Sequence, residues 1–524
     1  MSREMMEKMR DKDEKSNGGG TNAGAGRPSM PTLSSRIQGA LWGLIVGDAL
    51  GVPVEFRSRS ELEEDPVEDM RGWKVHQQPP GTWSDDSSLT LCTVDSILKT
   101  GWNLGDMGKR FCQWLYEGYL TPYGKVFDVG GTTKLALARV RMGTPPVEAG
   151  GRSEMDNGNG SLMRILPVAL YFAEAPFPML LQAVSDTSSL THAHPRSRLA
   201  CILYSLCLGE VLKGRSIPQA VKIVAETLSS PSTRRILSPA LSGELPTFSR
   251  VLTGAVIGCA RDEISSGGYV VDTLEASLWC VATSDSFSEA VLKAVNLGKD
   301  TDTTGAVAGG LAGAYWGVES IPSRWIEILA RKEEIFRLIE SFTRMLTQAV
   351  PFPDSYWVLP GKVLAGEYPR TKEEDASQAK LSNLLECGIT SLVDLTEENE
   401  RHSGIPLKPY HRMIEQLAAE KGKKVRVTRF PIPDGGTVEE RSMQEIHRFI
   451  DTSLERGDSV YIHCWGGHGR TGLVVGTWLV HAGLVSGKDA IESIRFLRRK
   501  MEDAYYPSPE TVHQVRMVEQ WRDF

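Results

Sequence analysis

Residues 296–317, NLGKDTDTTGAVAGGLAGAYWG, constrain the fold of this chain more than any other segment. The second half of the segment is dominated by small residues, namely Ala306, Ala308, Gly309, Gly310, Ala312, Gly313 and Ala314. Glycine disfavours an isolated helix by about 1 kcal/mol per residue relative to alanine, so this many glycines are tolerated only where close approach requires them. The segment therefore predicts a helix that packs very closely on its neighbours.

Two carboxylates, Asp300 and Asp302, stand at the start of this helix, and two hydroxyls, Thr303 and Thr304, follow directly. Either threonine could cap the helix, which would leave the oxygens of the loop free to converge on one point. Clusters made only of oxygen ligands suit hard cations such as Mg²⁺, Mn²⁺ or Ca²⁺ rather than zinc. An Asp-rich loop at a helix start is also a common structural feature, so this segment needs a partner elsewhere in the chain.

A second cluster of one hydroxyl and two acids, Ser84, Asp85 and Asp86, stands just before an amphipathic helix in GTWSDDSSLTLCTVDSIL. Taken alone, it favours a helix N-cap with acids placed against the helix dipole. Two such clusters, each at a helix start, favour a binuclear oxygen site instead. Metals paired in this way lie about 4 Å apart and can activate water or orient hydroxyls.

The apolar stretch RIQGALWGLIVGDALGVPVEF predicts a buried helix, with Ser34 or Ser35 as its N-cap. Its helical part contains one acid, Asp48, and a lone buried acid is costly unless it is paired. Asp48 therefore either bonds backbone at the end of the helix or lies with Glu55 near a polar site.

Length and composition set broad bounds on the chain. Its 524 residues predict two or more domains, and 41% hydrophobic with 24% charged residues is typical of a soluble globular protein. A net charge of −7 gives no case for general nucleic-acid binding. Eight scattered cysteines, an N-terminus without an apolar centre and the lack of a long uncharged apolar run predict a cytoplasmic protein without membrane association. Residues 1–33 are expected to be a disordered tail.

Three further segments with polar residues lie in the predicted helical region, which extends to residue 345. Asp128 precedes a helix start in VFDVGGTTKLALARV. The glycine-rich DNGNGSLMRILPVAL is predicted to open a helix near residues 156–164, where backbone N–H groups could bind a diphosphate, although it is neither a GxGxxG nor a Walker sequence. His192 and His194 precede another helix, where a capping or solvent role is the default interpretation.

Together these stretches resemble the ADP-ribosylglycohydrolases, the family of the dinitrogenase-reductase-activating glycohydrolase. The matches are GALWGLIVGDALGVPVEF, SDDSSLTLC, FDVGGTTKLAL, GNGSLMR, THAHP and GKDTDTTGAVAGGLAGA, in family order over roughly residues 35–345. The resemblance implies an all-α bundle with two divalent ions, Mg or Mn. It implies as metal ligands Ser84, Asp85, Asp86, Asp300, Asp302 and Thr303. The family more often has threonine where Ser84 stands, and a serine hydroxyl can serve.

The resemblance also implies functional residues around the metals. Asp128 and Glu55 match acids that different members place at the reaction centre, and which of them is catalytic stays open. An ADP-ribose groove is implied, lined by Gly158, Asn159, Gly160, Ser161 and His192. Cleavage at the ribose C1 passes through oxocarbenium-like charge, which nearby carboxylates stabilise. The alternative to an enzyme is a catalytically inactive domain that binds ADP-ribose without cleaving it.

Composition changes near Ala349, where a proline-rich stretch predicts a linker over residues 346–354. The segments ITSLVDLT, KVRVTRFPI and DSVYIHC are strand-like, and SMQEIHRFIDTSLERG is an amphipathic helix. Strands that alternate with helices predict an α/β domain with a central, mainly parallel sheet over residues 355–524.

The strongest motif of the chain, HCWGGHGRTG, lies in this second domain. Five residues, three of them glycine, separate Cys464 from Arg470, so the loop can hold a tetrahedral dianion in backbone N–H groups with Arg470 bidentate on its oxygens. The following helix and Arg470 favour a nucleophilic thiolate at Cys464. Thr471 can hydrogen-bond the sulfur as it leaves, and Asp434 in FPIPDGG is the candidate general acid.

This half resembles the protein-tyrosine and dual-specificity phosphatases, particularly the small cyclin-dependent-kinase-inhibitor-type members. The matches are PGKVLAGEYP, GITSLVDLTEENE, FPIPDGG, HCWGGHGRTG and SPETVHQVRMVEQW. The resemblance implies a phosphocysteine intermediate at Cys464, Asp434 as acid and then base, no metal, and a water-positioning role for Gln514. The basic segment RFLRRK is expected to be a solvated helix face, with attraction of an anionic substrate as the alternative.

The sequence thus predicts a bifunctional hydrolase of two domains, 34–345 and 355–524. The first would remove ADP-ribose from modified protein, and the second would hydrolyse phosphate esters on phosphoprotein. Two alternatives stay open. Both domains could process a small-molecule or nucleic-acid-derived phosphorylated ADP-ribose species, or the first could only bind ADP-ribose to target the phosphatase.

Overall fold

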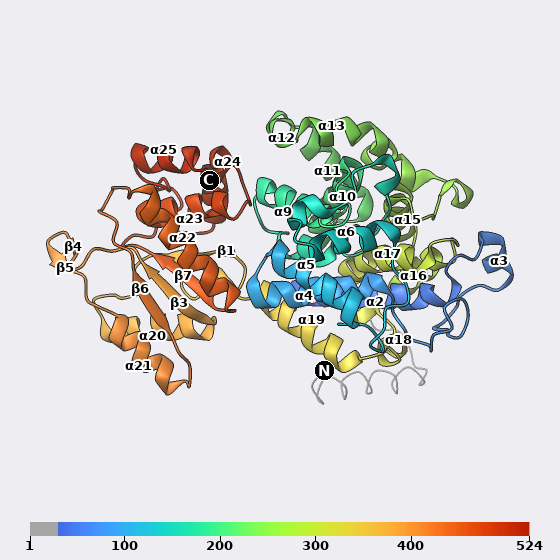
Figure 1. Cartoon of the computed structure of the whole chain (residues 1–524), viewed down its shortest axis with the longest axis horizontal. Coiled ribbons are helices and arrows are strands. Elements are labelled where there is room, and N and C mark those ends of the chain that lie inside the picture. Colours follow the sequence, from blue (N-terminus) through green and yellow to red (C-terminus); the bar gives the residue numbers. More distant parts are fainter. Residues whose placement is uncertain (1–29, 523–524) are drawn as a thin grey trace, which may run out of the picture.

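The computed structural model describes residues 30–522, which form a helical domain followed by a smaller α/β domain beside it (Figure 1). The predicted fold class, an all-α bundle followed by an α/β domain with a mainly parallel sheet, is confirmed. Most of the predicted disordered tail, residues 1–29, lies outside the described residues.

The helical domain extends from α2 to α19. Its α-helices are α2 (Leu33–Gly51), α3 (Arg59–Glu64), α4 (Asp85–Thr100), α5 (Leu104–Glu117), α6 (Gly131–Arg141), α7 (Pro146–Ala149), α8 (Leu166–Tyr171), α9 (Phe177–Ser189), α10 (Pro195–Leu212), α11 (Ile217–Ser229), α12 (Pro231–Ile236), α13 (Pro239–Glu244), α14 (Ser249–Leu252), α15 (Val270–Ala282), α16 (Phe287–Val295), α17 (Thr301–Trp316), α18 (Ser323–Glu327) and α19 (Lys332–Leu346).

Helices α2 and α17 lie antiparallel at the centre of this domain, in backbone-to-backbone contact. Three glycine pairs face each other: Gly39 with Gly313, Gly43 with Gly309, and Gly47 with Gly305. Glycines four residues apart share one face of a helix, so each helix offers a smooth stripe. A Cβ atom on any of the six would lie under 3.0 Å from the opposing carbonyl oxygen. The predicted close packing is therefore confirmed, and its partner is α2.

The capping predictions for these two helices were wrong. Thr32 caps α2 instead of Ser34 or Ser35, because its side chain accepts from the backbone N–H of Ser35. Asp300 is the N-cap residue of α17, and both threonines lie inside the first turn. The Thr304 hydroxyl donates to the Asp300 carbonyl at 2.6 Å, which anchors it to the helix backbone.

The segment Leu33–Val54 meets the length and composition of a membrane span, with a mean hydropathy of 1.4, although it contains Arg36 and Asp48. However, 94% of this apolar window is buried inside the protein. This burial is characteristic of the core helix of a globular domain.

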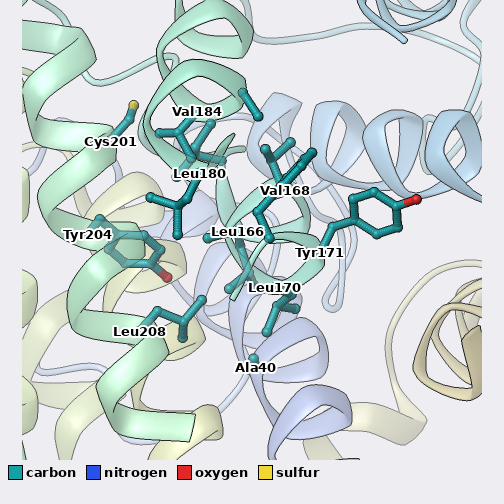
Figure 2. Close-up of a cluster of buried hydrophobic side chains, with 14 of the residues drawn as sticks. Ala40, Leu166, Val168, Leu170, Tyr171, Leu180, Val184, Cys201, Tyr204 and Leu208 are labelled. Atoms are coloured by element: carbon teal, nitrogen blue, oxygen red, sulfur yellow. The ribbon is translucent and has the colours of Figure 1, made fainter. Parts of the chain in front are cut away.

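A second part of the core surrounds the short helix α8. In Figure 2, Leu166, Val168 and Leu170 of α8 lie among side chains of α9 and α10, with Ala40 of α2 beside them. The glycine-rich loop does open a helix, but this helix begins slightly later than predicted: α8 starts at Leu166, with Pro167 in its first turn. The preceding residues instead make turns, and the backbone N–H of Asn159 donates to the Gly268 carbonyl at 3.0 Å.

The α/β domain has a five-stranded sheet in the order β1-β2-β7-β3-β6. Strands β2, β7, β3 and β6 are parallel, and β1 is antiparallel to β2. The elements are β1 (Ser355–Leu359), β2 (Val363–Gly366), α20 (Glu374–Glu386), β3 (Ile389–Asp394), the hairpin strands β4 (Arg401–His402) and β5 (Ile405–Pro406), α21 (His411–Glu420), β6 (Arg426–Arg429), α22 (Glu440–Glu455), β7 (Ser459–His463), α23 (Gly469–His481), α24 (Gly487–Leu497) and α25 (Val512–Gln520). The three strand-like segments of the sequence contain β3, β6 and β7.

The sequence analysis expected the basic segment RFLRRK to be a solvated helix face. The structure shows instead that two of its arginines pack within the protein. Arg498 is buried and pairs with Asp503 at 2.9 Å. Arg499 pairs with Glu174 of the helical domain at 3.1 Å. The domains also meet where the Lys362 ammonium donates to the Lys99 carbonyl at 2.8 Å.

The contact between α2 and α17 predicts a large effect for Gly309→Ala. The new Cβ would meet the Gly43 carbonyl oxygen of the opposing backbone, so the helices must separate, and overpacking of this kind costs about 2 kcal/mol or more. Gly209→Ala in α10 is the matched control, since its Cβ would meet nothing within 4 Å and it should be neutral or stabilising by up to about 1 kcal/mol. Thermal unfolding of both variants measures the difference. Equal melting temperatures would contradict the contact.

Candidate active sites

Three segments of the helical domain bring acids to one place. Asp48 lies near the end of α2, Asp86 in the first turn of α4, and Asp302 in the first turn of α17. The contact between α2 and α17 fixes this arrangement, because Gly51 at the end of α2 packs on the backbone of Asp302. Two acidic segments more than 200 residues apart in the sequence therefore share one site, as the sequence predicted.

The carboxylates form two overlapping groups. Asp48, Asp86 and Asp302 each offer an oxygen within 4.8 Å of the others, and so do Glu55, Asp300 and Asp302. Asp302 belongs to both groups. Asp86 Oδ2 is buried and has no hydrogen-bond partner among the described residues. An orphaned carboxylate oxygen in an oxygen-only cluster fits a hard divalent cation, and the shared Asp302 fits a pair of cations.

The electrostatics of the cluster point the same way. Burial, followed by repulsion from neighbouring carboxylates, raises the pKa of Asp85, Asp86 and Asp302 well above the usual range. Burial raises the pKa of Glu55 to about 7. Such a concentration of buried acids is unfavourable unless positive charge or protons compensate it.

Asp48, for which the sequence left two interpretations open, belongs to this site. Both of its oxygens accept from the backbone N–H of Ser84 at 3.0 Å, and Oδ2 also accepts from the Ser87 backbone N–H at 3.1 Å and the Ser87 hydroxyl at 2.5 Å. Asp48 thus holds the first turn of α4 while it also lies in a carboxylate group. Both interpretations from the sequence apply to it.

The other predicted ligands lie at this site in different ways. The Thr303 hydroxyl donates to Asp86 Oδ1 at 3.3 Å. The Ser84 hydroxyl caps α4 by accepting from the Asp86 backbone N–H at 3.3 Å. Asp85 is buried beside the cluster but belongs to neither carboxylate group. Asp128 is also outside both groups, and burial raises its pKa.

His76 is a residue of this site that the sequence analysis missed. Its Nε2 hydrogen-bonds Glu55 Oε2, and its ring lies 5.9 Å from the ring of Phe56 and 5.3 Å from that of Phe127. His76 therefore links Glu55 to the segment that carries Asp128. It stands in an irregular loop without a recognisable motif, so no local signal could have identified it.

The predicted groove residues divide into two kinds. Asn159 joins the acidic site, because its side-chain amide donates to Asp300 Oδ2 at 2.9 Å. His192 lies over the glycine loop, where a Cβ on Gly160 would be 2.8 Å from the imidazole Cε1. Ser161 instead is fully buried, with its hydroxyl 2.8 Å from that of Ser188, so it supports the loop from the core.

The second site lies where β7 ends and α23 begins. The loop from Cys464 to Arg470 connects them, and both side chains are almost fully buried. Arg470 Nη1 and Nη2 each donate to one oxygen of Glu400 at 2.7 Å. Nη2 also lies 3.1 Å from Asp434 Oδ1, whereas Nε has no partner among the described residues. The Thr471 hydroxyl is likewise buried without a partner.

Glu400 is the second residue that the sequence analysis missed. It lies in the acidic run TEENE after β3, which does not reveal which acid turns inward. Burial is the largest influence and raises its pKa. The hydrogen bonds from Arg470 and from the Glu397 backbone N–H, together with the charge of Arg470, lower the pKa overall. Gln514 braces the loop that carries Asp434, because its carbonyl accepts from the Thr511 N–H and its amide donates to the Gly436 carbonyl at 2.9 Å. Its expected role in positioning water stays a prediction.

The folds and sites define a two-domain hydrolase with an oxygen-rich acidic centre and a cysteine–arginine loop. The family model described as ADP-ribosylglycohydrolase matches residues 29–351, and that described as polymorphic toxin system, DSP-PTPase phosphatase, matches residues 366–484. The chain therefore belongs to the ADP-ribosylglycohydrolase family and carries a phosphatase domain after it, as predicted. Both domains are of hydrolase families.

Individual relatives agree with this assignment. The ADP-ribosylarginine hydrolase Tri1 of Serratia proteamaculans is 33% identical in a match of 320 residues that covers 59% of this chain and 79% of Tri1. The ADP-ribosyl-[dinitrogen reductase] glycohydrolase of Rhodospirillum rubrum is 32% identical over 309 residues, covering 58% of this chain and 93% of that protein. A solved structure titled ADP-ribosylglycohydrolase-related protein complex has a TM-score of 0.51 at 34% identity, and the match covers 60% of this chain and 99% of that one.

The bidentate contact between Glu400 and Arg470 predicts that Glu400→Gln lowers kcat/KM for an aryl phosphate. A neutral amide has one acceptor oxygen in place of two, so it cannot form the bidentate pair with the guanidinium. Arg470 then loses its fixed orientation, and we expect a loss of about tenfold to a hundredfold. Glu398→Gln, an exposed acid two residues earlier, is the control and should leave the rate unchanged. Equal rates for both variants would show that Glu400 does not orient Arg470.

Proposed function

We propose that the helical domain removes ADP-ribose from arginine side chains of modified proteins, with two Mg²⁺ or Mn²⁺ ions as cofactors. The observation that carries this proposal is the pair of carboxylate groups that share Asp302, with Asp86 Oδ2 left without a hydrogen-bond partner in the part of the chain that the structure describes. The relation to proteins described as ADP-ribosylarginine hydrolases supports arginine as the linkage.

The chain's own groups divide the work at this site. Asp86, Asp300, Asp302, Glu55 and Thr303 would hold the cations. When bound, such a pair of ions supplies Lewis-acid polarisation of water and ribose hydroxyls. Asn159 orients Asp300 through its amide, and the buried carboxylates face the positive charge that develops at the ribose C1.

Asp128 is our candidate for proton transfer to the leaving guanidine nitrogen. It lies outside both carboxylate groups, so its carboxyl group is not needed to hold a cation. Burial raises its pKa, which favours the protonated form that a general acid requires. Glu55, bonded to His76 and grouped with Asp300 and Asp302, fits a cation-holding role better.

The second domain is proposed to hydrolyse phosphate monoesters on phosphoproteins through Cys464. The thiolate would attack phosphorus and form a phosphocysteine, while Asp434 gives its proton to the leaving oxygen. Asp434 would then accept a proton from the water that releases phosphate. Asp434 contacts Arg470 Nη2. An incoming phosphate would replace the Asp434 carboxyl group on the guanidinium, and Asp434 would then be free to transfer its proton.

A cytoplasmic location is part of the proposal. The cysteines of the described residues, Cys464 among them, are all free thiols, which suits a reducing compartment and a thiolate nucleophile. The substrates would then be ADP-ribosylated and phosphorylated proteins of the cytoplasm.

The hydrolase assignment predicts metal-dependent release of free ADP-ribose from arginine-ADP-ribosylated protein. Chelation should abolish release, and Asp302→Asn should lower it by about a thousandfold or more, because Asp302 serves both carboxylate groups. The affinity for Mn²⁺, measured by calorimetry, should decrease in the same variant. Asp262→Asn, whose side chain is 92% exposed, is the control.

Two outcomes of that experiment would overturn the proposal. Binding of Mn²⁺ without release of ADP-ribose from arginine would point to another linkage or to a small-molecule ADP-ribose species. Binding of ADP-ribose without any Mn²⁺ binding would leave a docking module for the phosphatase.

The phosphatase assignment predicts that Cys464→Ser removes activity on a generic aryl phosphate by more than about a thousandfold, because a serine hydroxyl is not ionised at neutral pH. Cys387→Ser is the matched control, a partly exposed cysteine of the same domain, and should keep full activity. Steady-state assays of the full chain without added metal test both variants. Activity that survives Cys464→Ser would refute the nucleophile assignment.

A further inference from the structure

Arg164, in the GNGSLMR stretch, is a buried cation that neither proposed reaction uses. Its side chain is fully buried and forms no ion pair with a carboxylate of the described residues, and its guanidinium lies over the Phe111 ring, with Cζ 4.8 Å from the ring centroid. Nη2 donates to the Thr187 carbonyl at 3.1 Å and to the Thr191 hydroxyl oxygen at 2.7 Å, whereas Nε and Nη1 have no hydrogen-bond partners in residues 30–522. A buried charge with so few hydrogen-bond partners is costly, which points to a role beyond packing.

The hydrogen bonds beyond Arg164 lead to His192. Thr191 Oγ1, which accepts from Arg164, lies 2.9 Å from His192 Nδ1. An arginine can only donate hydrogen bonds, so the hydroxyl hydrogen of Thr191 remains free for another acceptor. Thr191 is fully buried, and Nδ1 is the available acceptor among the described residues. If Nδ1 carried a proton, this hydroxyl hydrogen would be left buried without an acceptor.

All of these groups have a hydrogen-bond partner only if the Thr191 hydroxyl donates its hydrogen to His192 Nδ1. A neutral imidazole then carries its own proton on Nε2. The ring is neutral at physiological pH, because burial and the nearby charge of Arg164 lower the pKa of His192 to about 3.

The Nε2 atom faces the glycine loop of the predicted groove. A Cβ on Gly160 would lie 3.3 Å from Nε2, and one on Gly158 would lie 3.6 Å from it. Within residues 30–522, Nε2 has no hydrogen-bond partner, although the side chain of His192 is more than nine-tenths buried. It is thus a positioned donor that lacks an acceptor among the described residues.

We propose that Arg164 and Thr191 are positioning residues that fix His192 as the Nε2–H tautomer, so that it donates to an acceptor oxygen of the ADP-ribose unit. The proposal rests on the proposed function of the helical domain only for the identity of this ligand. Neither Arg164 nor Thr191 touches the ligand; both act through the imidazole.

The test is the tautomer of His192, measured by ¹⁵N–¹H correlation spectra of the full chain with ¹⁵N-labelled histidine. A His192→Asn variant identifies the signal. The wild type should show Nε2 protonated and Nδ1 bare. Thr191→Val, which removes the hydroxyl without changing the shape, should shift the proton toward Nδ1. Thr191→Ser should restore the wild-type pattern, and Thr187→Val, a buried threonine one turn earlier, should not alter it.

ADP-ribose affinity, measured by calorimetry with Mg²⁺, supplies the second readout. Thr191→Val should weaken binding about tenfold, because Nε2 would then present a lone pair to the ligand oxygen. Arg164→Met provides an independent variant that removes a poorly satisfied buried charge and should show a mixture of both tautomers.

The two readouts separate the inference from the proposed function. A wild-type His192 protonated on Nδ1, or an unchanged tautomer in both Thr191→Val and Arg164→Met, would overturn the inference whatever the affinities are. A wild type with the expected tautomer that does not bind ADP-ribose would instead refute the ligand assignment of the domain.

Discussion

The contact between the glycine stripes of α2 and α17 is the constraint on which the first active site depends. Because no side chain separates the two backbones, the C-terminal end of α2 and the first turn of α17 meet directly. This places Asp48 and Asp302 in one carboxylate group, and Asp48 in turn holds the first turn of α4 with Asp86. Larger residues at the contact would separate the acids, so helix packing and site geometry are one feature here.

Both active sites lie at helix N-termini, but they use the positive end of the helix dipole differently. In the helical domain, the first turns of α4 and α17 stabilise carboxylates of the protein itself, which can then hold cations. In the phosphatase domain, α23 begins within the loop that follows Cys464, so its N–H groups lie where the proposed phosphate substrate would bind. In the first site the negative charge belongs to carboxylates of the protein, whereas in the second it would belong to the bound substrate.

Predictions from the sequence failed mostly where a polar side chain had several possible partners. Glu400 was one of several adjacent acids, His76 stood in a loop without a motif, and Arg164 was one arginine in a matching stretch. Their roles depend on contacts with Arg470, Glu55 and Thr191, which lie from 21 to 70 residues away in the chain. Helix starts were also misplaced, because several neighbouring hydroxyls could cap each helix equally well.

The sequence by itself determined the two domains, the close packing of the small-residue helix, the acidic segments and the cysteine–arginine loop. These features are local: residue size, spacing and the order of strand, loop and helix specify them. Only the tertiary structure decided that α2 is the partner of α17, that Asp302 serves two carboxylate groups, and that Glu400 holds Arg470. Those results depend on which distant residues share a buried space, and that depends on the packing of the whole domain.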